Sequence, residues 1–236
     1  MSNYIKHLKG QYGKSTFKRK MDYVDYNFGQ VIKNLPSKSC KILEIGPGMG
    51  EGVAYLNGRG FRNIDIVDND KNVLAVVADR FDVDKKYCVD DLTAIDDKAG
   101  KYDLVILIQV LEHLPLDQQA KIVGMLFSHL TKNGVMIIVV PNANNPLGMT
   151  ERYGDLQHQN SFTQQSLVDL VENSKVKNCD YKITGFEIPP YSVLNLIRIV
   201  LQKLLHFVLF LIMIINGGVY FRIMTPNAVL RLHKRN

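Results

Sequence analysis

The fold is decided by the stretch Ile42-Leu43-Glu44-Ile45-Gly46-Pro47-Gly48-Met49-Gly50, a short apolar run that ends in a glycine-rich loop. An apolar run without alternation predicts a strand buried on both faces, and residues 53–57 predict the helix that follows the loop. Glycine lets the backbone turn tightly and approach a ligand closely. Because ligands of open α/β sheets bind outside the carboxyl ends of the strands, this loop is the first candidate for a binding site.

The same alternation of apolar runs and helical patterns continues along the chain. Further strands are predicted at residues 63–67, 86–89, 102–108, 135–140, 182–188 and 228–234. Helices are predicted at residues 71–81, 118–130 and 164–173, and Asn133-Gly134 predicts a turn. Right-handed crossovers between buried parallel strands give a doubly wound α/β sheet, and 236 residues suffice for one such domain with added elements.

Composition and charge restrict the setting of the protein. Cys40, Cys88 and Cys179 form neither a zinc spacing nor a disulfide framework, and residues 1–20 lack the apolar core of a signal peptide, so we expect a cytoplasmic protein. The net charge of +6 is concentrated near residues 14–20 and 231–235. Such a bias suits nucleic acid, anionic lipid, a phosphorylated substrate or a solvated surface, and of these we expect a nucleic-acid partner least.

Acidic residues surround the glycine loop and follow the neighbouring strands. They are Glu44, Glu51, Asp68, Asp90 and Asp91. The loop reads G-x-G-x-G rather than the G-x-G-x-x-G of dinucleotide sites, and the carboxylates would repel a pyrophosphate. They favour a ligand with an ammonium group, a sulfonium and a ribose diol. Asp68 is placed for the ribose hydroxyls, and Asp90 and Asp91 for an adenine amino group, with Leu92 against the ring. Any one of these acids could instead cap a helix or turn.

Three motifs together resemble those of class I S-adenosylmethionine-dependent methyltransferases. Residues 42–50 resemble the first signature motif, and Ile66-Val67-Asp68 the second. Tyr102-Asp103-Leu104-Val105 followed by Val110-Leu111-Glu112-His113-Leu114 resembles the fourth-strand motif. The resemblance covers roughly residues 41–140. It implies a Rossmann-like, seven-stranded, mostly parallel sheet with S-adenosylmethionine as cofactor.

The resemblance also implies roles for individual residues in binding the cofactor. Glu44, Gly46, Gly48 and Gly50 would line its methionine end. Asp68, with its neighbour Asn69, would hold the ribose, and Gln109 would lie near the transferable methyl group.

Methyl transfer is an in-line displacement of a neutral thioether, so it needs alignment and, for a poor nucleophile such as a sugar hydroxyl, a general base. The candidates are His113, after the fourth strand, and His158, in the loop after the fifth. Asp155 could orient or charge His158. Alternatively, Asp155 and His158 only pin the loop, and Glu112-His113 serves packing or capping.

The loop at residues 152–163, preceded by residues 141–146, resembles bacterial methyltransferases of surface polysaccharide clusters such as lipopolysaccharide O-antigen. This resemblance implies a sugar hydroxyl as the acceptor, free or lipid-linked. Gln159 stands where we would expect an acid, and we predict no metal site. One alternative is a lipid or quinone-like acceptor, because Glu112-His113-Leu114 is common in that group. Another is a non-catalytic, methyltransferase-like subunit of a membrane complex, against which the intact glycines and Asp68 argue.

Residues 193–215 are apolar and long enough to cross a membrane, but Asn195, Arg198, Gln202 and His206 form a polar stripe beside Lys203. If residues 228–234 return to the sheet, a single crossing would strand them on the wrong side. We therefore expect an interfacial helix or re-entrant hairpin at the inner face of the cytoplasmic membrane, or alternatively a buried or dimer-forming helix.

These expectations divide the chain into three parts. Residues 1–40 form an N-terminal helical cap, and residues 41–191 and 219–236 form the methyltransferase domain. Residues 192–218 form the apolar helical insertion before the last strand.

Overall fold

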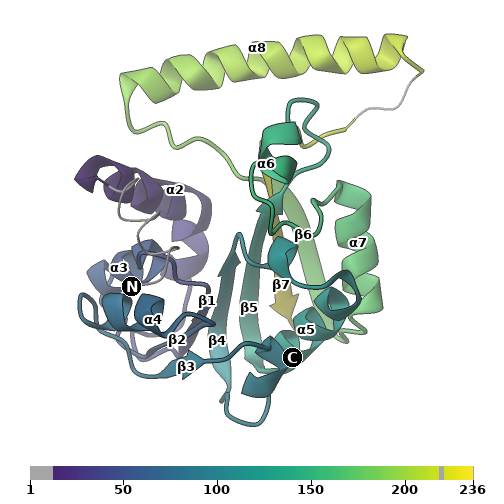
Figure 1. Cartoon of the computed structure of the whole chain (residues 1–236). Helices are drawn as coiled ribbons and strands as arrows, with labels where there is room; N and C mark the ends of the chain where they lie inside the picture. The colour runs from purple at the N-terminus through teal and green to yellow at the C-terminus, as the bar shows by residue number, and fades with distance from the viewer. Residues whose placement is uncertain (1–12, 218–220, 236) are drawn as a thin grey trace.

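A seven-stranded sheet forms the centre of the computed structural model, which describes residues 13–217 and 221–235 (Figure 1). Its strands are β1 (Ile42–Ile45), β2 (Ile64–Asp68), β3 (Lys86–Cys88), β4 (Tyr102–Ile108), β5 (Leu130–Pro141), β6 (Cys179–Gly185) and β7 (Asn227–Lys234). Their order in the sheet is β3-β2-β1-β4-β5-β7-β6. Among these strands β7 runs opposite to the other six and pairs antiparallel with β5 and β6, so the predicted mostly parallel, doubly wound sheet is confirmed.

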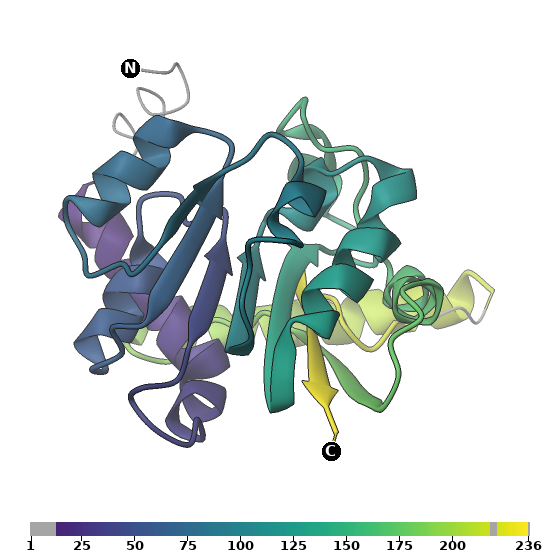
Figure 2. The same cartoon turned by 90° about the horizontal axis from the view of Figure 1, so that it is seen from below.

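Helices cover both faces of the sheet (Figure 2). One face carries α2 (Lys14–Lys33), α3 (Glu51–Gly58) and α4 (Lys71–Ala78). The other carries the 3-10 turns η1 (Leu92–Ile95) and η2 (Leu111–His113) and the helices α5 (Leu116–Ser128) and α7 (Gln164–Asn173). Successive strand residues point to opposite faces, so Leu104 and Ile106 join the first core layer and Val105 and Leu107 the second.

Two predicted boundaries differ from the observed ones because the sheet overrides local signals. The turn at Asn133-Gly134 lies inside β5, where Asn133 adopts a φ of 63° and the register with β4 shifts between Tyr102 and Leu104. The strand expected at 182–188 is β6, which begins earlier because it pairs with β7 from Cys179 onward.

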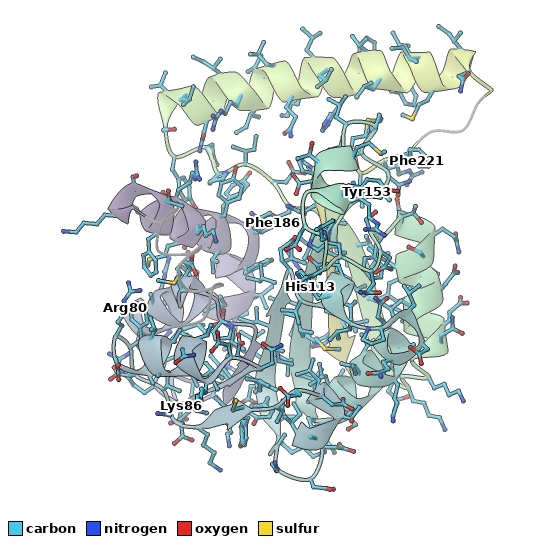
Figure 3. All side chains as sticks on the ribbon, viewed as in Figure 1. Arg80, Lys86, His113, Tyr153, Phe186 and Phe221 are labelled. Carbon is cyan, nitrogen blue, oxygen red and sulfur yellow. The ribbon has the colours of Figure 1, made fainter. Side chains whose placement is uncertain are left out.

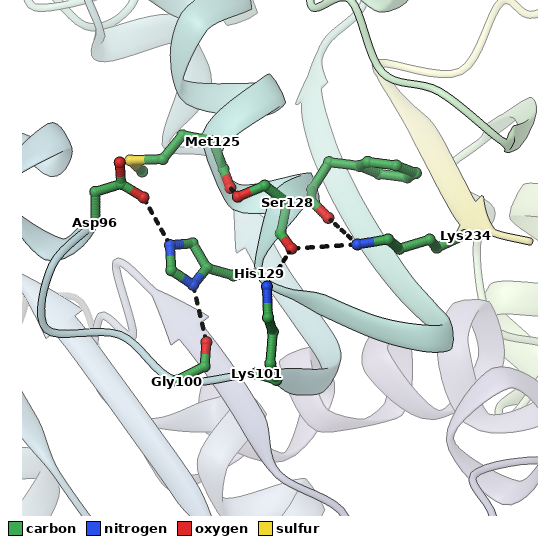
Figure 4. A network of polar contacts seen from close by, with 8 residues as sticks. Asp96, Gly100, Lys101, Met125, Ser128, His129 and Lys234 are labelled. Atoms are coloured by element: carbon green, nitrogen blue, oxygen red, sulfur yellow. Dashed lines mark hydrogen bonds and ion pairs between the residues drawn. The ribbon is translucent and has the colours of Figure 1, made fainter. Parts of the chain in front are cut away.

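The amino-terminal edge of the sheet is closed by a hydrogen-bond network around His129 (Figure 4). His129 Nε2 lies 2.8 Å from Asp96 Oδ1, and His129 Nδ1 lies 2.9 Å from the Gly100 carbonyl oxygen. Lys234 donates to the carbonyl oxygens of Ser128 and Leu130. Both ring nitrogens of His129 have partners, which suits a structural role for this edge.

The apolar helix α8 (Val193–Ile215) lies across the opposite, carboxyl-terminal end of the sheet, beyond the short helix α6 (Met149–Tyr153) (Figure 1). It precedes β7, which inserts between β5 and β6, so the predicted helix before the last strand is confirmed. Of the N-terminal cap predicted at 1–40, residues 1–12 lie outside the described residues. In the remainder, α2 buries Val24, Phe28 and Ile32 in the core.

Candidate functional site

The glycine loop joins β1 to α3 at the carboxyl-terminal edge of the sheet. Gly46, Gly48 and Gly50 have φ values of 67°, 55° and 85°, which side chains with a Cβ rarely adopt. A Cβ on Gly46 would lie 2.5 Å from Val110 Cγ2, and one on Gly50 would lie 2.7 Å from the Phe81 ring. At Gly48 the nearest atom to such a Cβ would be Glu51 Oε2 at 3.7 Å, so this glycine leaves space for a ligand.

Glu44 is buried directly beneath this loop. The backbone N–H of Val53 donates to its carboxylate, yet Glu44 Oε2 has no hydrogen-bond partner within the described part of the chain. Burial, and then the nearby Glu51, raise the pKa of Glu44 to about 8. Glu51 itself faces Lys20, with 3.3 Å between Oε1 and Nζ. A buried carboxylate with an open oxygen suits a cationic group such as an ammonium.

Asp68 ends β2 and is only partly buried. Its Oδ1 accepts a hydrogen bond of 2.8 Å from the backbone N–H of Asp70. Burial raises the pKa of Asp68, and the hydrogen bond from Asp70 opposes that shift. The neighbouring Asn69 is exposed. Asp68 therefore lies at the strand tip next to the glycine loop, as a ribose-binding acid would.

The acids after β3 fit a cofactor-binding role less well than Asp68. Asp90 and Asp91 are exposed, and Asp91 caps η1 by accepting a hydrogen bond of 2.8 Å from the backbone N–H of Thr93. This is the capping role that the sequence left open. Leu92 is buried in the core layer of α5 and α7.

Gln109 directly follows β4 in a strained conformation, with a φ of 55° that is uncommon for a residue other than glycine. Its Nε2 donates a hydrogen bond of 3.0 Å to Asn227 Oδ1 at the start of β7. Sequence reasoning missed Asn227, because only the antiparallel insertion of β7 beside β5 brings it to this edge.

Glu112, His113 and His158 form a second polar cluster at the same edge, and their ligand atoms all lie within 4.8 Å of one another. The two imidazole rings pack edge to face, with centroids 4.6 Å apart and an interplanar angle of 69°. Glu112 is fully buried, and neither of its carboxylate oxygens has a hydrogen-bond partner in the described residues. Burial raises the pKa of Glu112 to about 8. Burial also lowers the pKa of His113, and the nearby His158 lowers it further.

The orientation of His158 determines which ring nitrogen is available. Its Nδ1 lies 2.9 Å from the carbonyl oxygen of Glu151, which can only accept a hydrogen bond. The network thus assigns the ring proton to Nδ1 and leaves the lone pair on Nε2. The loop is fixed by Arg152, which donates to the carbonyl oxygens of His158 and Gln159 at 2.8 Å each.

The predicted pairing of Asp155 with His158 is not the contact that orients the imidazole. Asp155 Oδ1 accepts a hydrogen bond of 2.8 Å from the backbone N–H of Gln157, and Asp155 is exposed. The carbonyl oxygen of Glu151 occupies the position of the orienting acid, because the turn at 155–158 brings His158 back against α6.

The cluster offers one carboxylate and two imidazoles, which are groups that could hold a divalent cation. Our prediction of no metal site did not include this set, because Glu112-His113 and His158 are far apart in the sequence. Figure 3 shows His113 near the ends of the central strands, with Tyr153 on the side toward α8. What the cluster can do without a metal is accept a proton at a ring nitrogen.

Comparisons with known proteins place this geometry in context. A family model described as a methyltransferase domain matches residues 12–178. No curated protein matches the chain.

Solved structures share the fold at low sequence identity. A SAM-dependent methyltransferase from Archaeoglobus fulgidus has a TM-score of 0.62 and 16% identity, covering 94% of this chain and 97% of that one. The plantazolicin methyltransferase BpumL in complex with SAH has a TM-score of 0.63 and 15% identity, covering 99% and 89%. The methyltransferase domain of bacterial CtHen1-CN has a TM-score of 0.55 and 17% identity, covering 89% and 99%.

Proposed function

This chain belongs to a family of methyltransferase domains and its cofactor is S-adenosylmethionine; from this premise we propose that it methylates a sugar hydroxyl of a cell-surface polysaccharide or its lipid-linked precursor. When bound, the cofactor supplies the methyl group of its sulfonium, and its sulfur is left as a neutral thioether. The protein must therefore bind the cofactor, align the acceptor and take up one proton.

Three observations support the glycine loop and its neighbours as the cofactor site. Glu44 Oε2 is a buried acceptor without a partner in the described chain, which an amino-acid ammonium would supply. Gly48 leaves room for close approach of a ligand to the backbone. Asp68 presents a carboxylate at the tip of β2, where a ribose diol would be recognised.

The observation that carries the acceptor chemistry is the lone pair on His158 Nε2, held at the same sheet edge as the glycine loop. A sugar hydroxyl is a poor nucleophile, so removal of its proton as the new carbon–oxygen bond forms is where a base contributes, typically about 10²–10⁴-fold. His158 would take that proton. His113 and Glu112 would lie beside the acceptor in this cluster.

A second candidate acceptor is a lipid or quinone-like small molecule, which the exposed apolar helix α8 favours. A third reading, a binding subunit without catalysis, predicts that the protein retains cofactor but changes no metabolite.

Comparative mass analysis of cells with and without this protein tests the proposal. We expect the surface glycan or its lipid-linked precursor to be heavier by one methyl group only when the protein is present. A methylated lipid or quinone with an unchanged glycan would assign the second acceptor class. Cofactor binding without change in either pool would refute methyl transfer.

A further inference from the structure

The helix α8 exposes an unusually large apolar surface. It is 23 residues long, is apolar enough by composition to cross a membrane, and contains no buried residue. A soluble domain rarely leaves so much contiguous apolar surface open to water.

The two faces of α8 are arranged in the reverse order of a normal surface helix. The face toward the domain, recognised by its partly buried side chains, consists of Asn195, Ile199, Gln202, His206, Leu209, Phe210 and Met213. The opposite face, which we call the outer face, consists of Val193, Ile197, Val200, Leu204, Val208, Leu211 and Ile215. All seven outer-face side chains are 42% or more exposed. A helix of a soluble domain turns its apolar stripe inward, so the outer face is built for a different environment.

Charge indicates what that environment is. The sequence of α8 contains no Asp or Glu, whereas Arg198 and Lys203 are exposed on the two sides of the helix, between the outer face and the domain face. Flanking cations with long apolar stems can reach lipid headgroups while the helix lies at the acyl boundary. The chain as a whole carries a net charge of +6, which adds attraction to an anionic surface.

The topology excludes a single crossing of the bilayer. The strand before α8 and the strand after it, β6 and β7, are hydrogen-bonded neighbours in one sheet. A helix of this length spans about 35 Å, close to the thickness of a bilayer, so crossing would place its two ends on opposite sides. Both ends return to the same domain; α8 must therefore lie in the plane of the surface.

The carboxyl-terminal edge of the sheet lies on the same side of the domain as α8 (Figure 1). The loop that carries His158 adds exposed apolar side chains to this side, namely Leu147, Met149, Tyr153 and Leu156. Leu156 is fully exposed. Apolar side chains around a site that faces a membrane would contact the lipid part of an acceptor.

We propose that α8 lies flat in the surface of an anionic bilayer, with its outer face in the acyl boundary, so that the site edge opens toward the membrane and takes an acceptor carried on a lipid. The docking rests on α8 alone, whereas the lipid-carried acceptor also rests on the proposed function.

The protein contains no tryptophan, so a single introduced tryptophan reports one position without background. Leu204→Trp is placed on the outer face, and Met213→Trp on the domain face of the same helix. In vesicles of phosphatidylglycerol and phosphatidylcholine, we expect a blue shift and strong quenching by brominated acyl chains for Leu204→Trp only. Equal quenching of both variants would indicate a spanning helix, and quenching of neither would overturn the docking.

Co-sedimentation with the same vesicles tests the chemistry of the surface. We expect Val200→Asp with Leu204→Asp to weaken vesicle binding at least tenfold. Tyr181→Asp is the matched control: an exposed apolar side chain on β6 away from α8, with no expected effect. Circular dichroism checks that the variants fold. If the wild type ignores anionic vesicles and forms a dimer that the double variant dissociates, the partner is a second copy and the proposal is wrong.

Failure of the docking and failure of the proposed function give different results. Vesicle binding by His158→Ala, together with an unmethylated glycan in wild-type cells, would refute glycan methylation and leave the docking intact. Glycan methylation by a wild-type protein that does not bind vesicles would refute the docking.

Discussion

At the scale of single residues, the site is defined by buried carboxyl groups with oxygens that have no hydrogen-bond partner among the described residues. Glu44 and Glu112 both have pKa values raised to about 8 by burial. Between the ordinary carboxyl pKa near 4.5 and about 8, the folded protein holds protons that the unfolded chain has released. The free energy of unfolding must then fall as the pH rises through this window.

Glu44→Gln tests this linkage. The amide stays neutral, so we expect the variant without cofactor to lose less stability than the wild type between pH 5 and pH 8.5, as measured by thermal unfolding. The same substitution removes the negative charge offered to the ammonium, and calorimetry should show cofactor binding weakened by about tenfold or more. Parallel pH profiles for variant and wild type would show that Glu44 is ionised without cofactor and contradict the assignment.

His158→Ala tests the base. We expect kcat for a sugar acceptor to fall by about 10²–10⁴-fold while cofactor affinity stays the same, because in the proposed mechanism Nε2 serves the acceptor and not the cofactor. His233→Ala is the matched control, an exposed histidine near the opposite end of the sheet. An unchanged rate for His158→Ala would reject this base.

The same cluster makes metal removal informative. Because our reading assigns the proton to His158 rather than to a metal-bound water, dialysis against EDTA should leave the rate unchanged. Loss of activity that Mg²⁺ or Mn²⁺ restores would show instead that Glu112, His113 and His158 hold a cation.

At the scale of elements, the glycine loop contains one glycine that the packing of the fold requires and another that leaves room for the ligand. Gly46→Ala would place a methyl group against Val110 at a φ of 67°, so it should destabilise the fold, by about 1–2 kcal/mol from the backbone alone. Gly48→Ala has a similar backbone cost but meets space rather than protein. We expect its melting temperature to fall less than that of Gly46→Ala, while cofactor binding by calorimetry is lost. Retained binding by Gly48→Ala would move the ligand away from this loop.

The elements that the sequence predicted well are those whose signals are local. The apolar strands and the capped helix α7, predicted at 164–173, occur as expected because burial and Thr163 capping act within a few residues. The early start of β5 and β6 depends on pairing with distant strands, which no local pattern encodes. The site shows the same division. The glycine loop and Asp68 could be found from a motif, whereas Asn227 beside Gln109 and the Glu151 carbonyl beside His158 depend on long-range folding.

At the scale of the whole molecule, the two edges of the sheet differ in kind. The amino-terminal edge is closed around His129, whose ring nitrogens are both hydrogen-bonded (Figure 4). The carboxyl-terminal edge combines polar atoms without partners among the described residues, a strained Gln109 and the apolar loop below α8. The proposed ligand chemistry and the proposed membrane contact therefore fall on one side of the protein, which would couple where the protein binds to what it can methylate.

This coupling predicts that the surface, rather than the chemistry, limits reaction with a lipid-carried acceptor. Val200→Asp with Leu204→Asp alters only the outer face, so kcat/KM for a water-soluble acceptor analogue should equal that of the wild type. For the same sugar on a lipid in anionic vesicles, kcat/KM should fall at least tenfold, because the variant binds weakly to the membrane that holds the acceptor. Raising the salt concentration should reduce the wild-type rate on vesicles, since attraction to the headgroups is screened. An equal loss on both acceptors would show that α8 supports the fold of the site instead of delivering it to a membrane.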